Sequence, residues 1–181
     1  MGITSREKQG KVSYTPMKWD EMGNGMVACF PVHLTRIHPM FIGEYLHTLD
    51  PKNRLSLPAK FRKELGRSVV LTRGLDRCLY VYPKKSWKGQ AKVHAAHANG
   101  TAAGRGLARL FLAGAMEADV DSAGRVLVPD HLKSFAGLAT KAVVAGVAGR
   151  IEIWDEVAWQ KYTAAIERDA DSLAERVSES K

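Results

Sequence analysis

The chain has 181 residues, of which 45% are hydrophobic and 25% charged, the balance of an ordinary globular protein. No apolar run approaches the roughly 20 residues that a membrane-spanning helix requires, so we expect no membrane association. The formal net charge of +8 favours a polyanionic partner. Cys29 and Cys78 lie far apart without the CxxC spacing of a metal or redox site, which favours two free thiols over a structural disulfide.

The N-terminal part of the chain differs from the rest. Residues 1–39 show no sustained period of two or 3.6 residues, and we predict a poorly ordered extension. The run from Met26 to Leu34 has the character of a strand that Pro31 interrupts. Met40 stands immediately before the regular part of the sequence and is a candidate translation start.

A long segment of the chain recurs 71 residues later. Residues 43–62 read GEYLHTLDPKNRLSLPAKFR, and residues 114–133 read GAMEADVDSAGRVLVPDHLK. A further match, between residues 79–82 and 151–154, has an offset of 72, which indicates one inserted residue in the intervening loops. The sequence therefore predicts two copies of one β-hairpin unit.

Each copy shows the same order of predicted elements: an alternating strand, a tight turn, a second strand and a short helix that begins after a proline. Two further strands and a helix follow. In the first copy we expect strands at 41–49, 55–57, 69–72 and 78–82, and helices at 59–65, from 83 towards 98, and at about 103–112. In the second copy we expect the last helix to begin near residue 156. The resulting parts are a first repeat (43–88), a helical connector (89–113), a second repeat (114–160) and a C-terminal helix with a polar tail (161–181) that frays from about residue 169.

The turn of each copy carries Asp-x-x-x-Arg. Asn53 in the first turn takes the place of Gly124 in the second, and both residue types tolerate the positive φ that tight turns between strands often need. One interpretation is structural: the Asp accepts backbone N–H bonds, and the Arg pairs with it to hold the hairpin. The other is functional: the carboxylate orients the guanidinium for bidentate contact with guanine. The duplication, and Lys52 beside the first motif, favour a surface loop that contacts DNA.

The basic residues are concentrated in the first repeat. Residues 40–88 contain 11 Lys and Arg against 4 Asp and Glu, whereas residues 89–181 contain 11 against 12. This asymmetry suggests that one side of the molecule contacts a polyanion. The candidates for backbone contacts are Lys60, Arg62, Lys63, Arg67, Arg73 and Arg77, and for any single one of them a solvated helix face is an equally good interpretation.

Other patterns carry no function. His94 and His97 are spaced like two helical metal ligands, but no third ligand lies near them in the sequence, so we expect neither metal nor cofactor. Residues 100–106, GTAAGRG, lack the Gly-Lys-Ser/Thr of a phosphate-binding loop. The aromatic residues are expected to pack in the core or at an interface: Tyr80, Tyr82, Trp87, Trp154 and Trp159. No nucleophile–base pair is readable, so we do not expect an enzyme.

The segments MFIGEY, LDPKNRLSLPAKFR, DSAGRVLVP and IEIWD resemble MraZ, a family of bacterial DNA-binding transcriptional regulators associated with the division and cell-wall gene cluster. The resemblance covers about residues 40–165. It implies an α+β fold in which two tandem SpoVT-AbrB-like hairpin repeats form a swapped-hairpin, double-psi-like barrel with flanking helices. It also implies a homo-oligomeric ring that contacts DNA through Asp50, Arg54, Asp121 and Arg125, with Lys52 and Arg62 on phosphates. Asn53 departs from the family pattern, which prefers glycine there.

Our hypothesis is a cytoplasmic, nucleoid-associated regulator, mainly a repressor, that binds double-stranded DNA at promoter-proximal direct repeats. The first alternative is an antitoxin-like protein of AbrB fold whose main partner is another protein. The second is a small oligomeric enzyme, for which no residue set suggests a reaction.

Overall fold

The computed structural model describes residues 40–179, which lie within one structural unit spanning residues 36–181. The expectations for residues 1–39, including the strand character of 26–34 and the thiol of Cys29, fall outside the described residues. The strands are β1 (Phe41–Thr48), β2 (Arg54–Ser56), β3 (Ser68–Arg73), β4 (Leu79–Pro83), β5 (Met116–Asp119), β6 (Arg125–Leu127), β7 (Lys141–Ala148) and β8 (Arg150–Asp155). The helices are α1 (Ala59–Leu65), α2 (Lys84–Ala95), α3 (Ala102–Leu112), α4 (Asp130–Phe135), α5 (Glu156–Arg168) and α6 (Ala170–Glu179).

The two repeats exchange strands. All strand pairs are antiparallel, and a six-stranded sheet has the order β1–β7–β8–β4–β3–β5. The first strand of each repeat pairs with the third strand of the other, β1 with β7 and β5 with β3. The fourth strands, β4 and β8, pair with each other in the middle. Neither repeat can therefore complete its sheet alone, and the mixed α and β architecture follows from the duplication.

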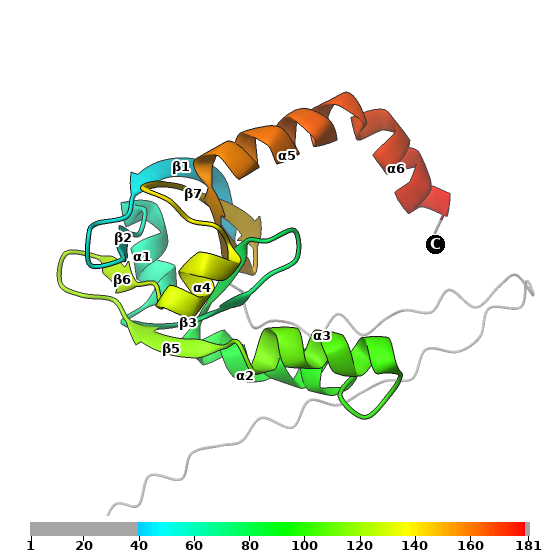
Figure 1. Cartoon of the computed structure of the whole chain (residues 1–181), viewed down its shortest axis with the longest axis horizontal. Helices are drawn as coiled ribbons and strands as arrows, with labels where there is room; N and C mark the ends of the chain where they lie inside the picture. The colour runs from blue at the N-terminus through cyan, green and yellow to red at the C-terminus, as the bar shows by residue number, and fades with distance from the viewer. Residues whose placement is uncertain (1–39, 180–181) are drawn as a thin grey trace, which may run out of the picture. The chain divides into compact units, whose positions relative to one another are not determined.

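The predicted closed barrel is not formed as one continuous sheet. Strands β1 and β5 are the two edges of the six-stranded sheet, while β2 and β6 make a separate two-stranded ribbon (Figure 1). Each strand of this ribbon is only three residues long, and Pro58 or Pro129 follows within two residues. Proline has no N–H to donate to a ladder, which limits the length of each ribbon strand. A single isolated bridge on each side, Leu49 with Leu55 and Val120 with Val126, connects the ribbon to the ends of β1 and β5.

The strand register also corrects the predicted offset between the repeats. Thr48 pairs with Lys141, and Asp119 pairs with Ser68. Thr48 and Asp119 are 71 positions apart, but Ser68 and Lys141 are 73 positions apart. The second repeat thus has two extra residues after its short helix, and a turn one residue shorter between its last two strands. The offset of 72 between the last strands therefore results from two changes, a gain of two residues and a loss of one, and not from a single insertion.

The main hydrophobic core lies between one face of the six-stranded sheet and the ribbon with helices α1 and α4. Leu55 and Val126, which are equivalent in the two repeats, pair across the ribbon and are fully buried. Phe61 of α1 packs edge-on against Phe41 and Tyr45 of β1, with ring centroids 5.3 and 5.2 Å apart. The ribbon that carries both predicted turns is therefore anchored directly in the core.

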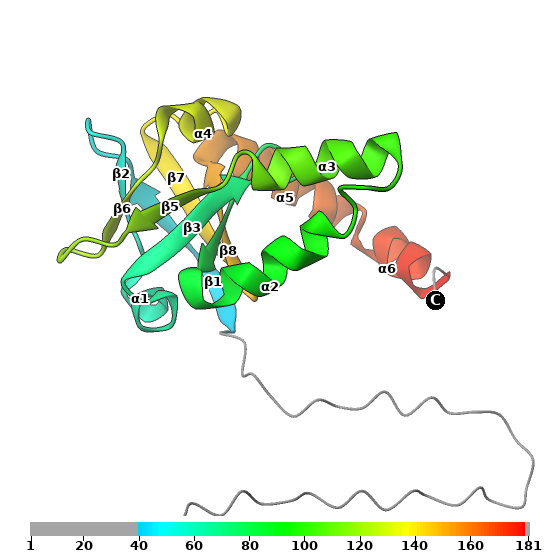
Figure 2. The ribbon, with the colours of Figure 1, turned by 90° about the horizontal axis from the view of Figure 1, so that it is seen from below.

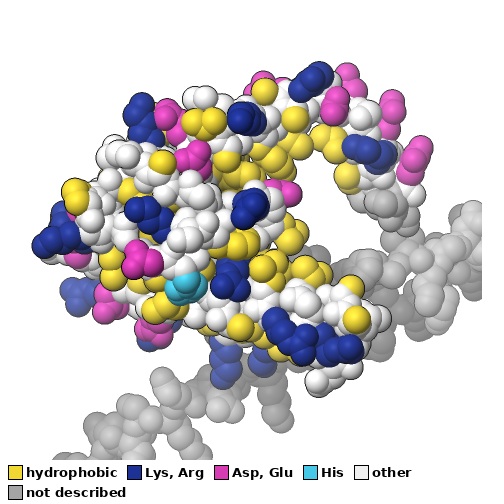
Figure 3. All heavy atoms as spheres, in the orientation of Figure 1, with side chains coloured by type: hydrophobic (Ala, Val, Ile, Leu, Met, Phe, Trp, Pro, Cys, Tyr) yellow, Lys and Arg dark blue, Asp and Glu magenta, His cyan; other side chains and the backbone are white. Residues whose placement is uncertain are grey.

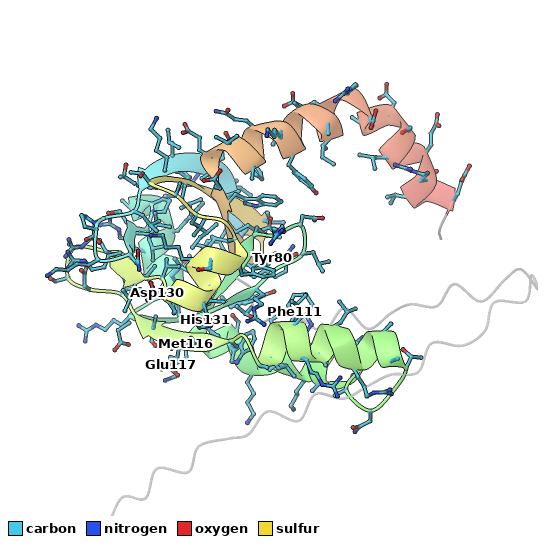
Figure 4. The ribbon with its side chains drawn as sticks, in the orientation of Figure 1. Tyr80, Phe111, Met116, Glu117, Asp130 and His131 are labelled. Atoms are coloured by element: carbon cyan, nitrogen blue, oxygen red, sulfur yellow. The ribbon has the colours of Figure 1, made fainter. Side chains whose placement is uncertain are left out.

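A second cluster covers the opposite face of the sheet, and it confirms the packing role predicted for the aromatic residues. Its buried members are Cys78, Tyr80, Tyr82, Phe111, Val143 and Trp154, with Trp87 and Trp159 packed against them. Phe111 of α3 stacks on Tyr80 at 5.9 Å and on His94 of α2 at 4.1 Å (Figure 4). His94 is thus a packing residue, and the described residues contain no group of three or more side chains that could hold a metal.

Two helical arms extend from this second cluster. The basic arm is α2 with α3, and the acidic arm is α5 with α6; both lie on the side of the sheet away from the turns of the ribbon (Figures 1 and 2). The tail expected to fray from residue 169 instead forms α6. The N–H of Asp169 donates to the carbonyl of Ala165 in α5, and the carbonyl of Asp169 accepts the N–H of Leu173 in α6. No helix within residues 40–179 is long and apolar enough to cross a bilayer.

Candidate nucleic-acid interface

The first Asp-x-x-x-Arg segment forms a closed turn between β1 and β2. The N–H of Asn53 donates to the carbonyl of Asp50 at 2.9 Å, and the N–H of Asp50 donates to the carbonyl of Arg54 at 3.0 Å. Asn53 has a φ of 56°, in the left-handed region that the sequence predicted for this position. The turn is therefore a fixed structure that leaves Pro51 and Lys52 exposed at its tip.

The carboxylate of Asp50 organises this turn. Its Oδ1 accepts the N–H groups of Lys52 and Arg54, both at 2.9 Å, and its Oδ2 accepts Nε of Arg54 at 2.6 Å. The backbone N–H of Arg54, and then its guanidinium, hold the pKa of Asp50 below the usual 3.8. The carboxylate therefore stays ionised at neutral pH and fixes the direction of the Arg54 side chain.

The second turn repeats this arrangement. Oδ1 of Asp121 accepts the N–H groups of Ala123 and Arg125 at 2.9 Å, and Oδ2 accepts Nε of Arg125 at 2.9 Å and forms an ion pair with its Nη2 at 2.8 Å. The N–H of Arg125, and then its side chain, lower the pKa of Asp121. Gly124 has a φ of 76° and takes the place of Asn53. The backbone bonds and the Nε–Oδ2 bond match those of the first turn, which confirms the predicted equivalence, while the contact of Nη2 with Oδ2 occurs only in the second turn.

The two turns leave opposite ends of the ribbon, because β2 and β6 are antiparallel, and Figure 2 shows the first turn on the side of α4 and the second on the side of α1. Nη1 of Arg125 lies 4.0 Å from Oδ2 of Asp50, so the second guanidinium reaches across to the first carboxylate. Arg54 is used differently: Asp50 holds only its Nε, and within residues 40–179 no acceptor bonds its two terminal nitrogens. Arg54 can therefore present both terminal nitrogens outward, whereas Nη2 of Arg125 is held in an ion pair with Asp121.

The predicted phosphate contacts Lys52 and Arg62 have different surroundings. Lys52 is exposed, and its side chain has no polar partner among the described residues. Arg62 of α1 is half-buried: its Nε donates to the carbonyl of Leu57 at 2.8 Å, and its guanidinium lies against Gly124 of the second turn. The first repeat thus supplies a basic residue to the turn of the second repeat, a contact that the sequence did not predict.

Beside the first turn, the position that corresponds to Arg62 beside the second turn belongs to a polar network that the sequence did not predict. The side chain of Asn53 donates to Oδ1 of Asp130 at 2.6 Å and accepts from Nζ of Lys133 at 2.7 Å. Both partners belong to α4, and Asp130 stands at its start (Figure 4). The substitution of asparagine for glycine was the signal available in the sequence. It ties the first turn to the second repeat.

Two of the basic residues suggested for backbone contacts are placed elsewhere. Arg73 ends β3, six residues beyond Arg67, which puts it about 20 Å from the turns at the usual rise of a strand. Its guanidinium lies over the ring of Phe135 at 5.7 Å, and its stem packs at Gly114. Arg77 follows in the turn between β3 and β4. Arg73 therefore packs against the second repeat away from the turns, and its contact with the DNA backbone stays a prediction.

This geometry satisfies both interpretations of the Asp-x-x-x-Arg motif. The Asp–Arg pairs hold the turns, as the structural interpretation requires. The same pairs orient two guanidinium groups at adjacent positions on an exposed surface, as the functional interpretation requires. The free terminal nitrogens of Arg54 and the exposed Lys52 are what a purely structural turn would not need.

The comparisons with known proteins agree with the duplication. The family model described as "MraZ protein, putative antitoxin-like" matches twice, at residues 40–109 and 111–179. The chain is 43% identical over 139 residues to the transcriptional regulator MraZ of Carboxydothermus hydrogenoformans, covering 76% of this chain and 96% of that protein. It is 44% identical over 141 residues to the transcriptional regulator MraZ of Clostridium tetani, covering 77% of this chain and 98% of that protein. The chain belongs to the MraZ family.

Proposed function

We propose that this protein is a sequence-specific DNA-binding transcriptional regulator, mainly a repressor, of the division and cell-wall gene cluster. It acts at the nucleoid in the cytoplasm and binds promoter-proximal direct repeats as an oligomeric ring through its paired turns. The relatives named as transcriptional regulators support the general role. The observation that carries the proposal is the pair of turns on one ribbon in which an ionised Asp holds the direction of an Arg, with Arg125 reaching from the second turn towards Asp50 of the first.

Arg54 is the main reading residue in this proposal. A guanidinium held at Nε keeps its two terminal nitrogens in one plane, the arrangement that suits O6 and N7 of guanine in the major groove. Such a bidentate contact discriminates against a wrong base by about 1–3 kcal/mol. Arg125 shares its donors with two carboxylates and contributes less to reading. Lys52, at the tip of the first turn, contacts a neighbouring phosphate.

The helical arms support assembly with further copies of the chain. Residues 84–112 of the basic arm contain six Lys and Arg and no Asp or Glu, whereas residues 156–179 of the acidic arm contain six Asp and Glu against three Lys and Arg. Figure 3 shows basic side chains gathered over α3 and acidic side chains over α6. Both arms also expose large apolar residues: Val93 and Leu107 on the basic arm, Val157 and Ile166 on the acidic arm. Pairing unlike arms of neighbouring protomers is a head-to-tail contact, and such a contact can close into a ring.

Assembly would also explain how such small turns bind DNA. Two turns of one protomer bury little surface, so a single protomer should bind weakly. Once one protomer of a ring is bound, its neighbours meet successive repeats at a high effective concentration, which raises overall affinity by about 10²–10⁴. Shifting the repeat spacing by half a helical turn should abolish this gain.

The test compares the wild type with Arg54→Ala and Arg54→Lys, using a direct-repeat promoter fragment and a scrambled fragment across a salt series. Arg54→Ala should remove the preference for the repeats. Arg54→Lys keeps the charge but loses the planar fork, so it should also lose preference while keeping much of the salt dependence. Arg168→Ala, an exposed arginine at the end of α5, is the matched control. Light scattering first verifies that it assembles as the wild type does, and it should then bind DNA as the wild type does.

Urea denaturation of the same proteins decides between the two interpretations of the motif. Lost preference with an unchanged unfolding midpoint supports DNA reading by Arg54. If Arg54→Ala instead unfolds at much lower urea, the pair serves the hairpin and the proposal loses its main residue. Equal binding of the wild type to both fragments would contradict sequence-specific recognition altogether.

The second candidate function is an antitoxin-like protein whose main partner is another protein, and it is supported by the words "antitoxin-like" in the description of the matching family. The two candidates differ in what the turns do. A protein-binding role predicts that Arg54→Ala, with unaltered arms, keeps the effect of the wild-type protein in the cell. The DNA-binding role predicts that this effect is lost.

A further inference from the structure

An open pocket lies beside the second turn, between that turn and the end of α1. Its lining includes Arg62 and Arg67 from the first repeat and Asp121, Ser122 and Gly124 from the second. Its volume of about 570 Å³ is many times the roughly 30 Å³ that one water molecule occupies in the liquid. Two repeats thus combine to form a polar pocket that neither could form alone.

The absence of a side chain at Gly124 allows Arg62 to enter this pocket. An added Cβ at Gly124 would lie 2.2 Å from both Cζ and Nε of Arg62 and 2.6 Å from its Nη1. The bond from Nε to the carbonyl of Leu57 fixes the guanidinium in that place. The terminal nitrogens of Arg62 have no hydrogen-bond partner within residues 40–179, so they remain donors for a ligand.

Arg67 approaches the pocket from the start of β3. Its carbonyl accepts the N–H of Val120 at 2.9 Å, which fixes its backbone next to the second turn. Its side chain is exposed and has no polar partner in the described part of the chain. The hydroxyl of Ser122 is likewise unpaired there. The pocket therefore offers two guanidinium groups and one hydroxyl.

The carboxylate in the lining does not cancel this positive charge. Both oxygens of Asp121 accept bonds from within its own turn, from the N–H groups of Ala123 and Arg125 and from the guanidinium of Arg125. Arg125 thus balances the charge of Asp121, and the two arginines of the pocket remain uncompensated. A small anion with several acceptor oxygens matches this set of donors.

The equivalent place beside the first turn lacks these donors. The side chain of Asn53 occupies the position that is open at Gly124, and it holds Lys133, the counterpart of Arg62. Leu49 donates its N–H to Thr140 as Val120 donates to Arg67, so Thr140 stands in the place of Arg67. The basic pocket is therefore a property of one turn and not of the repeat.

We propose that this pocket beside the second turn binds one phosphate group, through Arg62, Arg67 and Ser122. The assignment of that group to the DNA backbone rests on the proposed function, while a free phosphate has the same chemistry. On DNA, the bound phosphate would set the position of the protein so that Arg54, in the adjacent turn, meets a base edge. The first turn reads the sequence, and the second turn holds the backbone.

Arg67→Gln is the variant that tests the pocket, because Arg67 is exposed and makes no side-chain contact on which folding depends. Arg168→Gln is the matched control, with the same chemical change far from the pocket, and light scattering verifies that both variants assemble as the wild type does. The first measurement is the slope of log affinity against log salt for the direct-repeat fragment. Losing one phosphate contact should make the slope shallower by about 0.9 for each engaged protomer, without changing the preference for the repeats over scrambled DNA.

The second measurement needs no DNA. Replacing chloride by inorganic phosphate at constant ionic strength should raise the melting temperature of the wild type and of Arg168→Gln more than that of Arg67→Gln, because a ligand that binds the folded state stabilises it. A changed salt slope assigns the pocket to the DNA backbone. An unchanged slope with a reduced phosphate effect assigns it to a free phosphate.

The two proposals fail in different ways. If the wild type does not prefer the repeats, the proposed function is wrong, and the phosphate titration still decides whether the pocket exists as a site. If Arg67→Gln matches Arg168→Gln in both the salt slope and the phosphate titration, the phosphate site is overturned while the reading role of Arg54 stands.

Discussion

Replacing Gly124 by alanine tests the contact between the repeats at the second turn. Gly124 has a φ of 76°, and an added Cβ would lie 2.2 Å from the guanidinium of Arg62. Gly137 provides the matched control, because it also has a positive φ, 61°, but nothing lies within 4 Å of an added Cβ. The two variants share the backbone penalty and differ only in the contact with Arg62.

The expected cost follows from these two contributions. An L-residue in the left-handed region costs about 1–2 kcal/mol, and both variants incur this. In Gly124→Ala the guanidinium of Arg62 must also swing away and release the carbonyl of Leu57, and a hydrogen bond from a charged group is worth about 1.5–3 kcal/mol. We therefore expect Gly137→Ala to cost about 1–2 kcal/mol and Gly124→Ala about 2.5–5 kcal/mol. At roughly 2–4 °C per kcal/mol, the melting temperature of Gly124→Ala should be lower than that of Gly137→Ala by about 3–12 °C.

The assay is thermal and urea denaturation of both variants at one protein concentration, since assembly makes the apparent stability depend on concentration. The double variant Gly124→Ala with Arg62→Ala supplies the coupling, because without the guanidinium the glycine should tolerate alanine as well as Gly137 does. Equal destabilisation by Gly124→Ala and Gly137→Ala would refute the reasoning, as it would mean that Arg62 does not occupy the space at Gly124.

Three further predictions concern other parts of the molecule. Turn N–H groups and arginines hold the pKa values of Asp50 and Asp121 below 3.8. The two carboxylates therefore stabilise the folded protein fully above the unfolded pKa of about 3.9, and this stabilisation is lost as the pH falls through the lower folded values. The urea midpoint of the wild type should fall below about pH 4, and that of the double variant Asp50→Asn with Asp121→Asn should fall less. Phe111→Ala should cost about 3–5 kcal/mol, measured by urea denaturation, because the ring is buried between Tyr80 and His94; the exposed Leu107→Ala on the same helix should cost much less. Burial raises the pKa of the Cys78 thiol, so in a Cys29→Ser background the native protein should resist a thiol reagent that reacts at once in urea; fast reaction of the native protein would contradict the burial.

Much of the local structure could be read from the sequence, because short-range rules determine it. The helix α1 begins and ends where Pro58 and Gly66 predicted, and both turns have positive φ at the position shared by Asn53 and Gly124. An Asp that precedes an Arg by four residues in a turn between two strands has its carboxylate within reach of the turn's N–H groups and of the guanidinium. Duplication of the motif made the same prediction twice, and the structure bears out both copies.

Only the tertiary structure decided how the two copies combine. The exchange of β1 and β5 between repeats, the ribbon that does not close the sheet, and the basic pocket all depend on contacts between residues far apart in the sequence. Arg62 was a candidate phosphate ligand in the sequence, but nothing local shows that it lies against a glycine 62 positions away. The hydrophobic period specifies which face of each strand is buried, but many different partner strands could cover that face equally well. Which partner is chosen depends on the packing of the whole core, where Leu55 meets its own repeat counterpart, Val126.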